Sequence, residues 1–328
     1  MPEPLASTAA DAPEAARPRL RLGFLRNLTL LGLLALLWLG LALGTDSFAT
    51  IGNFQNLLRQ ASIWAIMAVG QTFVVITAGI DLSAGAVVGI AGTLVALLMK
   101  AGVPVPAAVL ATLALGVAIG WCHAFGVVRM GLPPFIMTLA SLTALRGIGL
   151  LMTNGQTIAG LPSGFSSFAR GEVAGVPNLF LAVIAVAVPC HVLLHHSRWG
   201  RYLYAVGSNR EAARLSGVRV GRVLYLAYIL SAVLSALAGV LTTARIGIGV
   251  ATTGDGWELQ AIASSVIGGA SLFGAVGSVP GPLLGAMLLT TINNGANLLN
   301  VNPFWQRIIT GALIVAIVYL DQARRPKR

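Results

Sequence analysis

Few of the 328 residues in this chain have side chains that could carry out chemistry, and most lie far apart in the sequence. His191 and His195 are four residues apart, with His196 beside them, which is a spacing that can place two rings on one metal ion. Carboxylates and cysteines that would complete such a site are missing nearby, so we favour histidines at a membrane interface and expect no metal site. Cys122 and Cys190 lie in apolar runs and are interpreted as small buried side chains.

The chain has no sequence signature for splitting ATP or for any other catalytic reaction. Neither of its two lysines follows a glycine-rich phosphate loop, and no Ser/His/Asp set is recognisable. We therefore expect a chain that is not an enzyme and holds no cofactor of its own.

Asp81 is the one charged residue in the forty from Gln60 to Met99. A carboxylate at bilayer depth is costly and is therefore often functional. The run Gly79-Ile80-Asp81-Leu82-Ser83 predicts a break between two spans, and we favour a structural role in which Asp81 or Ser83 accepts hydrogen bonds from N–H groups at the start of the next helix. The alternative is that Asp81 faces the pathway and binds a solute hydroxyl.

The elements around this break must lie in a membrane, because only 9% of the residues are charged and 56% are hydrophobic. A soluble domain normally carries about 25% charged residues. The apolar runs predict an all-α polytopic protein with about ten transmembrane helices, some of them broken or short. The predicted spans are 27–45, two within 60–99, 101–128, 131–152, 177–196, 223–244, two within 259–306, and 308–320. The eighth span is too short for a full crossing and is predicted to be a half-helix or a re-entrant segment.

Basic residues predict the orientation of the spans. With the N-terminus inside, 15 lysines and arginines fall on the cytoplasmic side and six fall outside or near helix ends. This asymmetry favours two cytoplasmic termini and explains the net charge of +11 without nucleic-acid binding. The predicted divisions are a disordered tail at 1–26, a transmembrane domain at 27–321 and a basic tail at 322–328.

The longest cytoplasmic connection, residues 197–222, is rich in arginine and has helical character after Ser208. Ser208 or Asn209 can cap a short helix, Glu211 stands in its first turn, and Gly217 ends it. Spacing alone leaves two alternatives open, a docking element for a partner or a basic loop that only fixes orientation.

This loop resembles the coupling segment of ABC importer permeases, which carries the pattern E-A-A-x-x-x-G. The residues here are Glu211, Ala212, Ala213, Arg214, Leu215, Ser216 and Gly217. The wider loop 205–223 and the blocks at 68–89, 261–286 and 293–321 are similar to permeases of the ribose/xylose/arabinose/galactose importer family. The resemblance covers residues 45–321.

The resemblance implies a homodimeric sugar permease. Its implied partners are a cytoplasmic ABC ATPase, which would bind the ATP and Mg²⁺, a periplasmic sugar-binding protein, a second copy of the chain and membrane lipid. Coupling to the ATPase is then assigned to Ser208, Asn209, Glu211, Ala212, Ala213, Arg214 and Gly217. Related permeases carry branched-chain amino acids or nucleosides, so another small solute is an alternative, as is an ion-coupled carrier that needs no ATPase.

The pathway itself leaves only weak marks in the sequence. Gly79, Asp81, Ser83 and Gly85 form the helix break, and Gly85 and Gly89 give the next helix a smooth face for close packing. Polar candidates for the pathway are Gln71, Thr72, Asn293 and Asn297, with Thr138 and Ser141 weaker still. For the asparagines we favour packing between helices over contact with a solute.

Overall fold

The computed structural model describes residues 19–302 and, beyond them, residues 304–306, 308, 309, 311, 312, 315, 319 and 322. Residues 1–18, the basic tail after 322 and most of the predicted tenth span lie outside the described residues. The first helix begins at Arg19, so the last eight residues of the predicted N-terminal tail are helical rather than disordered.

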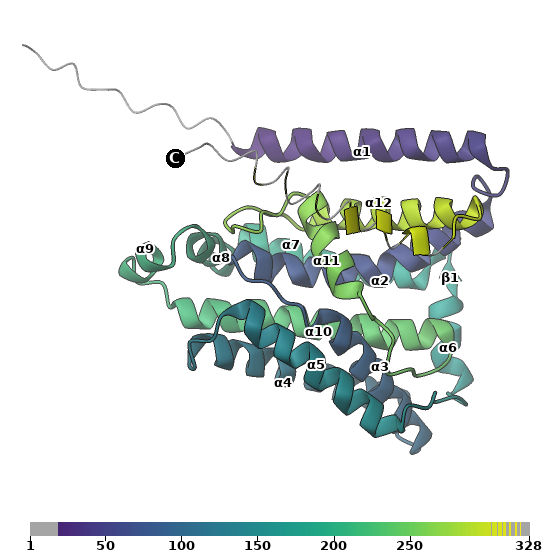
Figure 1. The fold of residues 1–328 in the computed structure, drawn as a ribbon, viewed down its shortest axis with the longest axis horizontal. Coiled ribbons are helices and arrows are strands. Elements are labelled where there is room, and N and C mark those ends of the chain that lie inside the picture. Colours follow the sequence, from purple (N-terminus) through teal and green to yellow (C-terminus); the bar gives the residue numbers. More distant parts are fainter. Residues whose placement is uncertain are drawn as a thin grey trace, which may run out of the picture.

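The described chain is a bundle of helices with one small hairpin at an end (Figure 1). The elements, in chain order, are α1 (Arg19–Gly44), α2 (Ile51–Ile76), α3 (Ala84–Lys100), α4 (Val105–Val128), α5 (Pro134–Thr153), α6 (Ser163–Arg170), β1 (Glu172–Val173), β2 (Val176–Pro177), α7 (Asn178–His196), α8 (Arg198–Ser208), α9 (Arg210–Leu215), α10 (Val220–Ile246), α11 (Trp257–Ile267) and α12 (Pro280–Leu298). The strands pair antiparallel, with Val173 opposite Val176.

Six of the described helices are long and apolar enough to cross a membrane: α2, α4, α5, α7, α10 and the part of α1 from Asn27 to Gly44. The expectation of an all-α membrane protein is therefore confirmed. The shortness predicted for the eighth span is also found. The 11 residues of α11 cover about 17 Å at 1.5 Å per residue, well under the ~30 Å of the hydrocarbon core.

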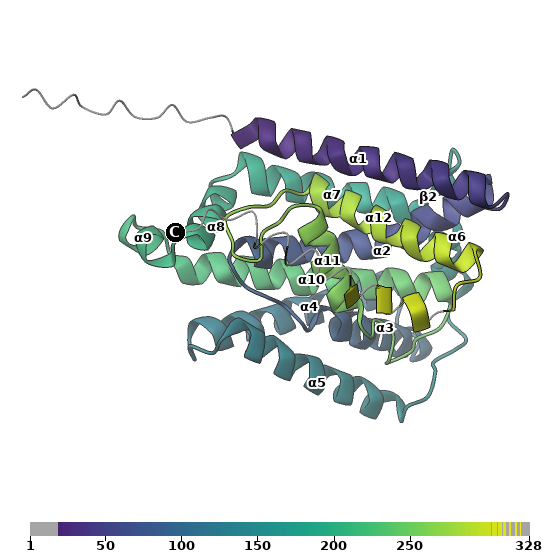
Figure 2. The ribbon, with the colours of Figure 1, turned by 45° about the horizontal axis from the view of Figure 1, so that its top comes forward.

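The centre of the bundle is formed by α2 and α10. The α10 helix packs against α2, α3 and α4, and α2 also packs against α7, α11 and α12. In the apolar window of α2, 89% of residues are buried, against 11% in α5 and 6% in α1. The helices α5 and α1 lie on opposite sides of the bundle in both views (Figures 1 and 2), so their apolar side chains face lipid or another chain.

Two non-helical segments interrupt the bundle, residues 77–83 between α2 and α3 and residues 268–279 between α11 and α12. They meet inside the protein, because the N–H of Ala275 donates to the carbonyl oxygen of Ile76 at 2.9 Å. Ala78, Gly274 and Ala275 all have positive φ angles of 58°, 90° and 59°. Non-helical backbone at membrane depth is tolerated where protein buries it, as here. We call these segments the first break and the second break.

Candidate functional site

The predicted coupling element is a one-and-a-half-turn helix, α9, that projects from one end of the bundle (Figure 1). Asn209 stands before it in an extended conformation, and its Oδ1 accepts from the N–H groups of Glu211 and Ala212, both at 3.0 Å. Asn209 is therefore the cap, whereas Ser208 is the last residue of α8. Gly217, with φ of 83°, follows the helix, and its N–H donates to the carbonyl oxygen of Arg214 at 3.0 Å.

The outer face of α9 carries an exposed ion pair. Arg214 Nε donates to Glu211 Oε2 at 3.0 Å, and about two thirds of each side chain is exposed. The hydrogen bond from Arg214 lowers the pKa of the Glu211 carboxyl, so that Glu211 is ionised at neutral pH. Ala212 is exposed beside the pair, whereas Ala213 is buried and attaches the helix to the bundle. The motif thus offers charge to a partner on one face and packs on the other.

The α8 helix connects this element to both breaks, a feature that the sequence analysis did not predict. Gly207 lies against the carbonyl group of Ile76 and beside Ala275 N, so that a side chain at this position would overlap the backbone of both breaks. The Tyr204 hydroxyl donates to Gly277 O at 2.8 Å, and burial raises the Tyr204 pKa to about 12, which keeps the proton on this donor. The sequence signal for this contact was Gly207, a glycine near the end of a largely bulky and basic stretch.

A third contact joins α9 directly to the first break. Arg210 Nη2 donates to the carbonyl oxygen of Thr77 at 3.3 Å. The first residue of α9 is therefore hydrogen-bonded to the chain just beyond α2. Any displacement of α9 acts on this carbonyl as well as on the contacts made by α8.

Asp81 lies deep in the bundle and is fully buried. Its Oδ1 accepts from the N–H and the hydroxyl of Ser83 at 2.9 and 2.6 Å, and its Oδ2 accepts from the hydroxyl of Ser231 at 2.7 Å. The carboxylate thus binds the residue before α3 rather than an N–H inside that helix, and Ser83 makes no side-chain cap. In this state the side chain contacts protein groups rather than an open pathway.

Asp81 lies far from the ends of the neighbouring helix α10. Ser231, its partner, is 11 residues into α10, which is about 17 Å from the start of that helix. The first break begins after Ile76, at Thr77, beside α8 and α9, and leads the chain back toward the middle of α10. The number and position of charged residues in the sequence could not reveal that the chain turns back into the bundle here.

Two other pathway candidates make buried contacts, Gln71 to the first break and Thr72 to α11. With its amide oriented so that Nε2 donates to Asp81 O and Oε1 accepts from Asp81 N, both at 3.2 Å, Gln71 holds the main chain of the first break. Thr72 shares a 2.8 Å hydrogen bond with Ser265 of α11. Thr138 of α5 donates to Ile80 O at 3.1 Å, whereas no contact of Ser141 distinguishes it. Gln71 and Thr138 thus join α2 and α5 to the first break, and Thr72 joins α2 to α11.

The asparagines of α12 behave differently from one another. Asn294, fully inside the bundle, exchanges two amide hydrogen bonds with Asn53 of α2, at 2.8 and 3.1 Å. Asn297 is exposed and its Oδ1 accepts from Gln306 at 2.7 Å. Asn293 is half-buried. The helix-to-helix contact is therefore made by Asn294, which lies between the two candidates Asn293 and Asn297.

Glycines of α3 accommodate the connection between α10 and α11. A Cβ at Gly85 would meet Gly254 O and the Glu258 carboxylate, and one at Gly89 would lie 2.5 Å from Ala251 O. The smooth face predicted for Gly85 and Gly89 is present, and it packs on this loop and, at Gly85, also on the first turn of α11. Arg146 holds the same loop, donating to Thr253 O at 3.0 Å and to Ala251 O at 3.2 Å.

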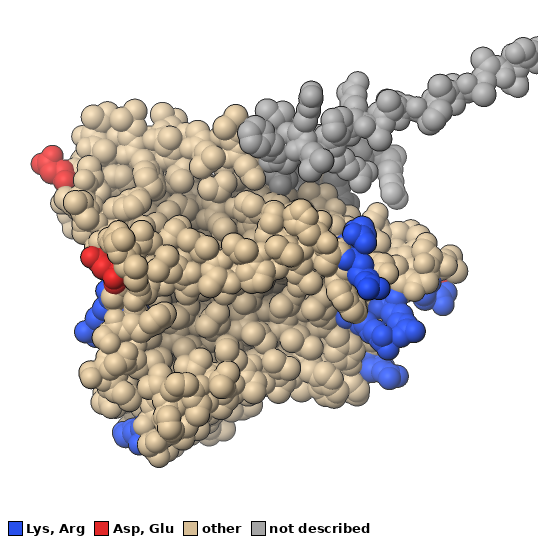
Figure 3. Space-filling model, turned by 180° about the vertical axis from the view of Figure 1, so that it is seen from behind, with Lys and Arg blue, Asp and Glu red and all other residues tan. Residues whose placement is uncertain are grey.

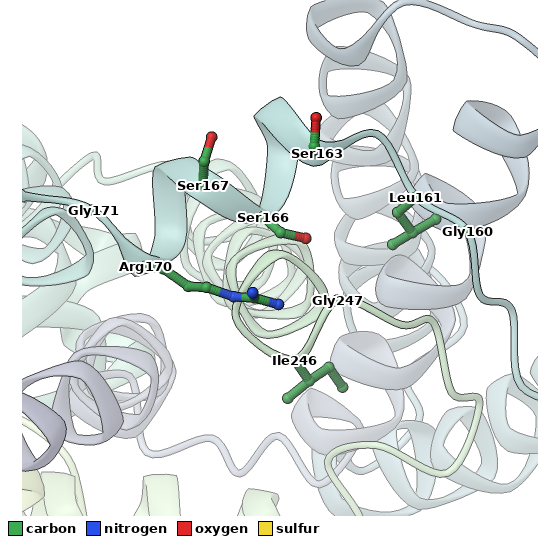
Figure 4. Close-up of a pocket in the computed structure, with 9 residues that line it drawn as sticks. All are labelled: Gly160, Leu161, Ser163, Ser166, Ser167, Arg170, Gly171, Ile246 and Gly247. Atoms are coloured by element: carbon green, nitrogen blue, oxygen red, sulfur yellow. The ribbon is translucent and has the colours of Figure 1, made fainter.

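At the opposite end from α9, three separate connections form one surface. Gln55 donates to Glu172 Oε2 at 2.6 Å, Arg245 donates to Asn56 Oδ1 at 3.1 Å, and Ile158 pairs with Gly249. A hollow of about 710 Å³ lies between α6 and the end of α10. Arg170 points across this hollow toward Gly247, with Ser166 beside it (Figure 4).

Charged side chains lie at the two ends of the molecule, with an uncharged belt between them (Figure 3). Basic side chains gather at the end that carries α8 and α9, on the right in that view, whereas the other end carries both acidic and basic side chains. The exposed arginines of the first end are Arg129, Arg198, Arg201, Arg210, Arg214, Arg219 and Arg222. This arrangement is the one expected of a protein whose middle is embedded in lipid.

Comparisons with known proteins agree with this architecture. Residues 53–318 match the family described as "Branched-chain amino acid transport system / permease component". The ribose import permease protein RbsC of Escherichia coli K12 is 39% identical over 285 residues, covering 86% of this chain and 89% of that protein. The galactose/methyl galactoside import permease protein MglC of the same strain is 38% identical over 302 residues, or 86% and 90% of the two chains.

A third relative matches over the full length. The probable ABC transporter permease protein y4mJ of Sinorhizobium fredii NGR234 is 36% identical over 331 residues, covering 100% of this chain and 99% of that protein. No solved structure matches this chain.

Proposed function

This chain belongs to the permease family described by the branched-chain amino acid transport system component, and we propose that it is the membrane-spanning subunit of an ATP-driven importer of a monosaccharide such as ribose. It is a transport subunit in the bacterial inner membrane and not an enzyme. In this proposal ATP and Mg²⁺ are bound by a separate cytoplasmic ATPase subunit.

The observation that carries the proposal is the position of α9. The helix exposes the Glu211–Arg214 pair and is attached, through Arg210 and through Gly207 and Tyr204 of α8, to both breaks. An ATPase that moves α9 therefore also moves Thr77, Gly277 and the point where the breaks meet. Because short non-helical segments absorb backbone rotation more readily than packed helices, α3 and α12 can shift relative to α2 and α11.

For the topology we propose ten crossings with both termini in the cytoplasm. The six long apolar helices, the shorter α3 and α12, α11 continued by the second break as far as α8, and the predicted span at 308–320 support this number. The arginines around α8 and α9 support a cytoplasmic position for that end, because basic residues accumulate on the inner side of membranes. The beginning of α1 lies at the same end (Figure 1).

The opposite end is then the docking face for a periplasmic sugar-binding protein. The three connections that meet there, around Gln55, Glu172 and Arg245, present a hydrogen-bonded surface on which such a protein can sit. A second copy of the chain is proposed to complete the pathway. The exposed apolar side chains of α5, including Ile136, Ile148 and Leu151, support packing against lipid or that copy.

A second cargo class remains in consideration because the family description names branched-chain amino acids. The relatives named for ribose and galactose favour a sugar for this chain. The ligand of the binding protein that works with this permease decides between the two.

The test is reconstitution. The purified chain should take up sugar into vesicles only when an ATPase subunit, a sugar-loaded binding protein and ATP are all supplied. Glu211→Lys should abolish uptake while leaving insertion intact, and Glu211→Asp, which keeps the negative charge at the same site, should retain uptake. Uptake by the chain alone on an ion gradient would refute the proposal in favour of an ion-coupled carrier.

A further inference from the structure

A pocket of about 370 Å³ lies where two membrane helices end, next to the proposed coupling element. Arg198 and Trp199 line it from the start of α8, which follows the end of α7 by a single residue. Arg219 and Arg222 line it from the start of α10. The pocket therefore lies at the level at which a bilayer has its headgroups.

The pocket is strongly cationic. Its three guanidinium groups belong to Arg198, Arg219 and Arg222, and none of them has an acidic partner among the described residues. Like charges gathered in one hollow repel one another unless an anion binds between them. The planar fork of arginine fits the oxygens of a phosphate group in a bidentate manner, so phosphate is the anion that suits this set of donors.

Two aromatic rings point to a lipid as the source of the phosphate. Trp199 and Tyr202 also line the pocket, and their rings meet edge to face with centroids 6.3 Å apart. Tryptophan and tyrosine concentrate at the boundary between hydrocarbon and water, where one part of the ring is apolar and the other is wet. A pocket for a free cytosolic anion needs no such rings.

The neighbouring helix offers a surface for acyl chains. Leu181, Ile184, Val188 and Val192 of α7 are all exposed and follow one another at intervals of three or four residues. This spacing places them on one helical face. The stripe ends six residues before Arg198, so a headgroup in the pocket would have an apolar track on the preceding helix, α7.

We propose that this pocket binds the phosphate headgroup of an anionic phospholipid, whose acyl chains lie along α7. The site goes beyond the importer function, because it needs neither a cargo nor an ATPase. Gly217 lines the pocket and also ends α9, so the bound headgroup supports the base of the coupling element. The lipid composition of the membrane would thereby influence how firmly α9 is held.

The test uses the purified full-length permease in detergent, with native mass spectrometry after addition of phosphatidylglycerol or phosphatidylcholine. The wild type should retain phosphatidylglycerol in preference to phosphatidylcholine and should gain thermal stability from it. The double variant Arg219→Gln/Arg222→Gln should lose this retention by on the order of tenfold, because each basic residue near the surface adds to the attraction for anionic lipid. The matched control is Arg129→Gln/Arg201→Gln, which removes two exposed arginines of the same end from outside the pocket and should retain lipid as the wild type does.

Four results would overturn the proposal. Three are equal retention of the two lipids by the wild type, undiminished retention by Arg219→Gln/Arg222→Gln, and an equal loss in both double variants. The fourth comes from an experiment with inorganic phosphate. If it stabilises the wild type as much as phosphatidylglycerol does, the pocket binds a free anion and the lipid assignment is wrong. Thermal midpoints without lipid show that each variant is folded, and none of these outcomes bears on whether the chain is an importer subunit.

Discussion

At the scale of single residues, Asp81 shows how a carboxylate is accommodated inside this bundle. Three hydrogen bonds, from Ser83 N, Ser83 Oγ and Ser231 Oγ, converge on its two oxygens. Donors of this kind stabilise a buried carboxylate, and each loses its acceptor if the carboxylate is removed. The residue therefore joins the first break to the middle of α10.

We predict that Asp81→Leu lowers the thermal midpoint of the purified permease more than Ser231→Ala does. The leucine leaves several buried donors unsatisfied, at roughly 1–3 kcal/mol each, whereas the alanine removes one donor together with its need for an acceptor. In the double variant the two losses should be less than additive by about 0.6–1.7 kcal/mol, the range for hydrogen bonds between membrane helices. Strict additivity would show that the Asp81–Ser231 contact contributes nothing to stability.

The sequence allowed part of this site to be predicted. A single charge in forty residues marked Asp81, and the glycine and serine around it indicated a break. The Ser231 contact could not be predicted, because it joins residues 150 apart and depends on how α2 and α10 pack. The same holds for Gln71, whose amide is directed at the Asp81 main chain rather than at a solute.

At the scale of elements, the short helix α9 depends on its cap. Six residues are too few for a stable isolated helix, so the two hydrogen bonds to Asn209 Oδ1 matter for its order. We predict that Asn209→Ala destabilises α9 by about 1 kcal/mol. Amide hydrogen exchange at Glu211 and Ala212 should become faster, and stimulation of the ATPase by the permease should fall.

Ser208→Ala is the matched control for this prediction, since it changes the adjacent residue and leaves Asn209 Oδ1 in place. Its exchange rates should match those of the wild type. Equal acceleration in both variants would mean that the loop as a whole, and not the cap, orders α9.

The meeting point of α8 with the two breaks is a close backbone contact. We predict that Gly207→Ala strongly reduces the amount of folded permease and abolishes uptake, because the new methyl group would overlap the backbone of Ile76 and crowd Ala275 N. Gly164→Ala in the exposed helix α6 is the control, since nothing lies within 4 Å of a Cβ there. It should be neutral or stabilising by up to about 1 kcal/mol.

Quantitative yield after size-exclusion chromatography and sugar uptake in vesicles measure both variants. Wild-type yield and uptake for Gly207→Ala would show that α8 is not wedged between the breaks.

The sequence predicted α9 because caps and breakers act within a few residues. It did not predict the contacts of α8, since the carbonyl of Ile76 and the N–H of Ala275 come from distant parts of the chain.

At the scale of the whole molecule, the spans followed from composition because lipid imposes a simple rule on length and polarity. Runs of apolar residues located α4, α5, α7 and α10 to within four residues, whereas α1 and α2 begin eight and nine residues before their predicted spans. The region 259–306 was harder, because it contains no charge to mark a boundary. Its division into the short α11, the second break and α12 depends on burial of the break against Ile76.

Orientation is the remaining property of the whole molecule, and it determines where an ATPase can bind. Single cysteines placed at exposed sites of the two ends, in a background where Cys122 and Cys190 are replaced by serine or alanine, report on which side each end lies. We predict that Ser216→Cys on α9 reacts with a membrane-impermeant maleimide in inside-out vesicles and not in intact spheroplasts. Gly175→Cys at the hairpin should show the reverse pattern, because the arginine-rich end faces the cytoplasm and the opposite end faces outward. Labelling of Ser216→Cys in spheroplasts that remain sealed, judged by an unlabelled cytosolic protein, would place α9 beyond the reach of any cytoplasmic ATPase and would contradict the proposed coupling mechanism.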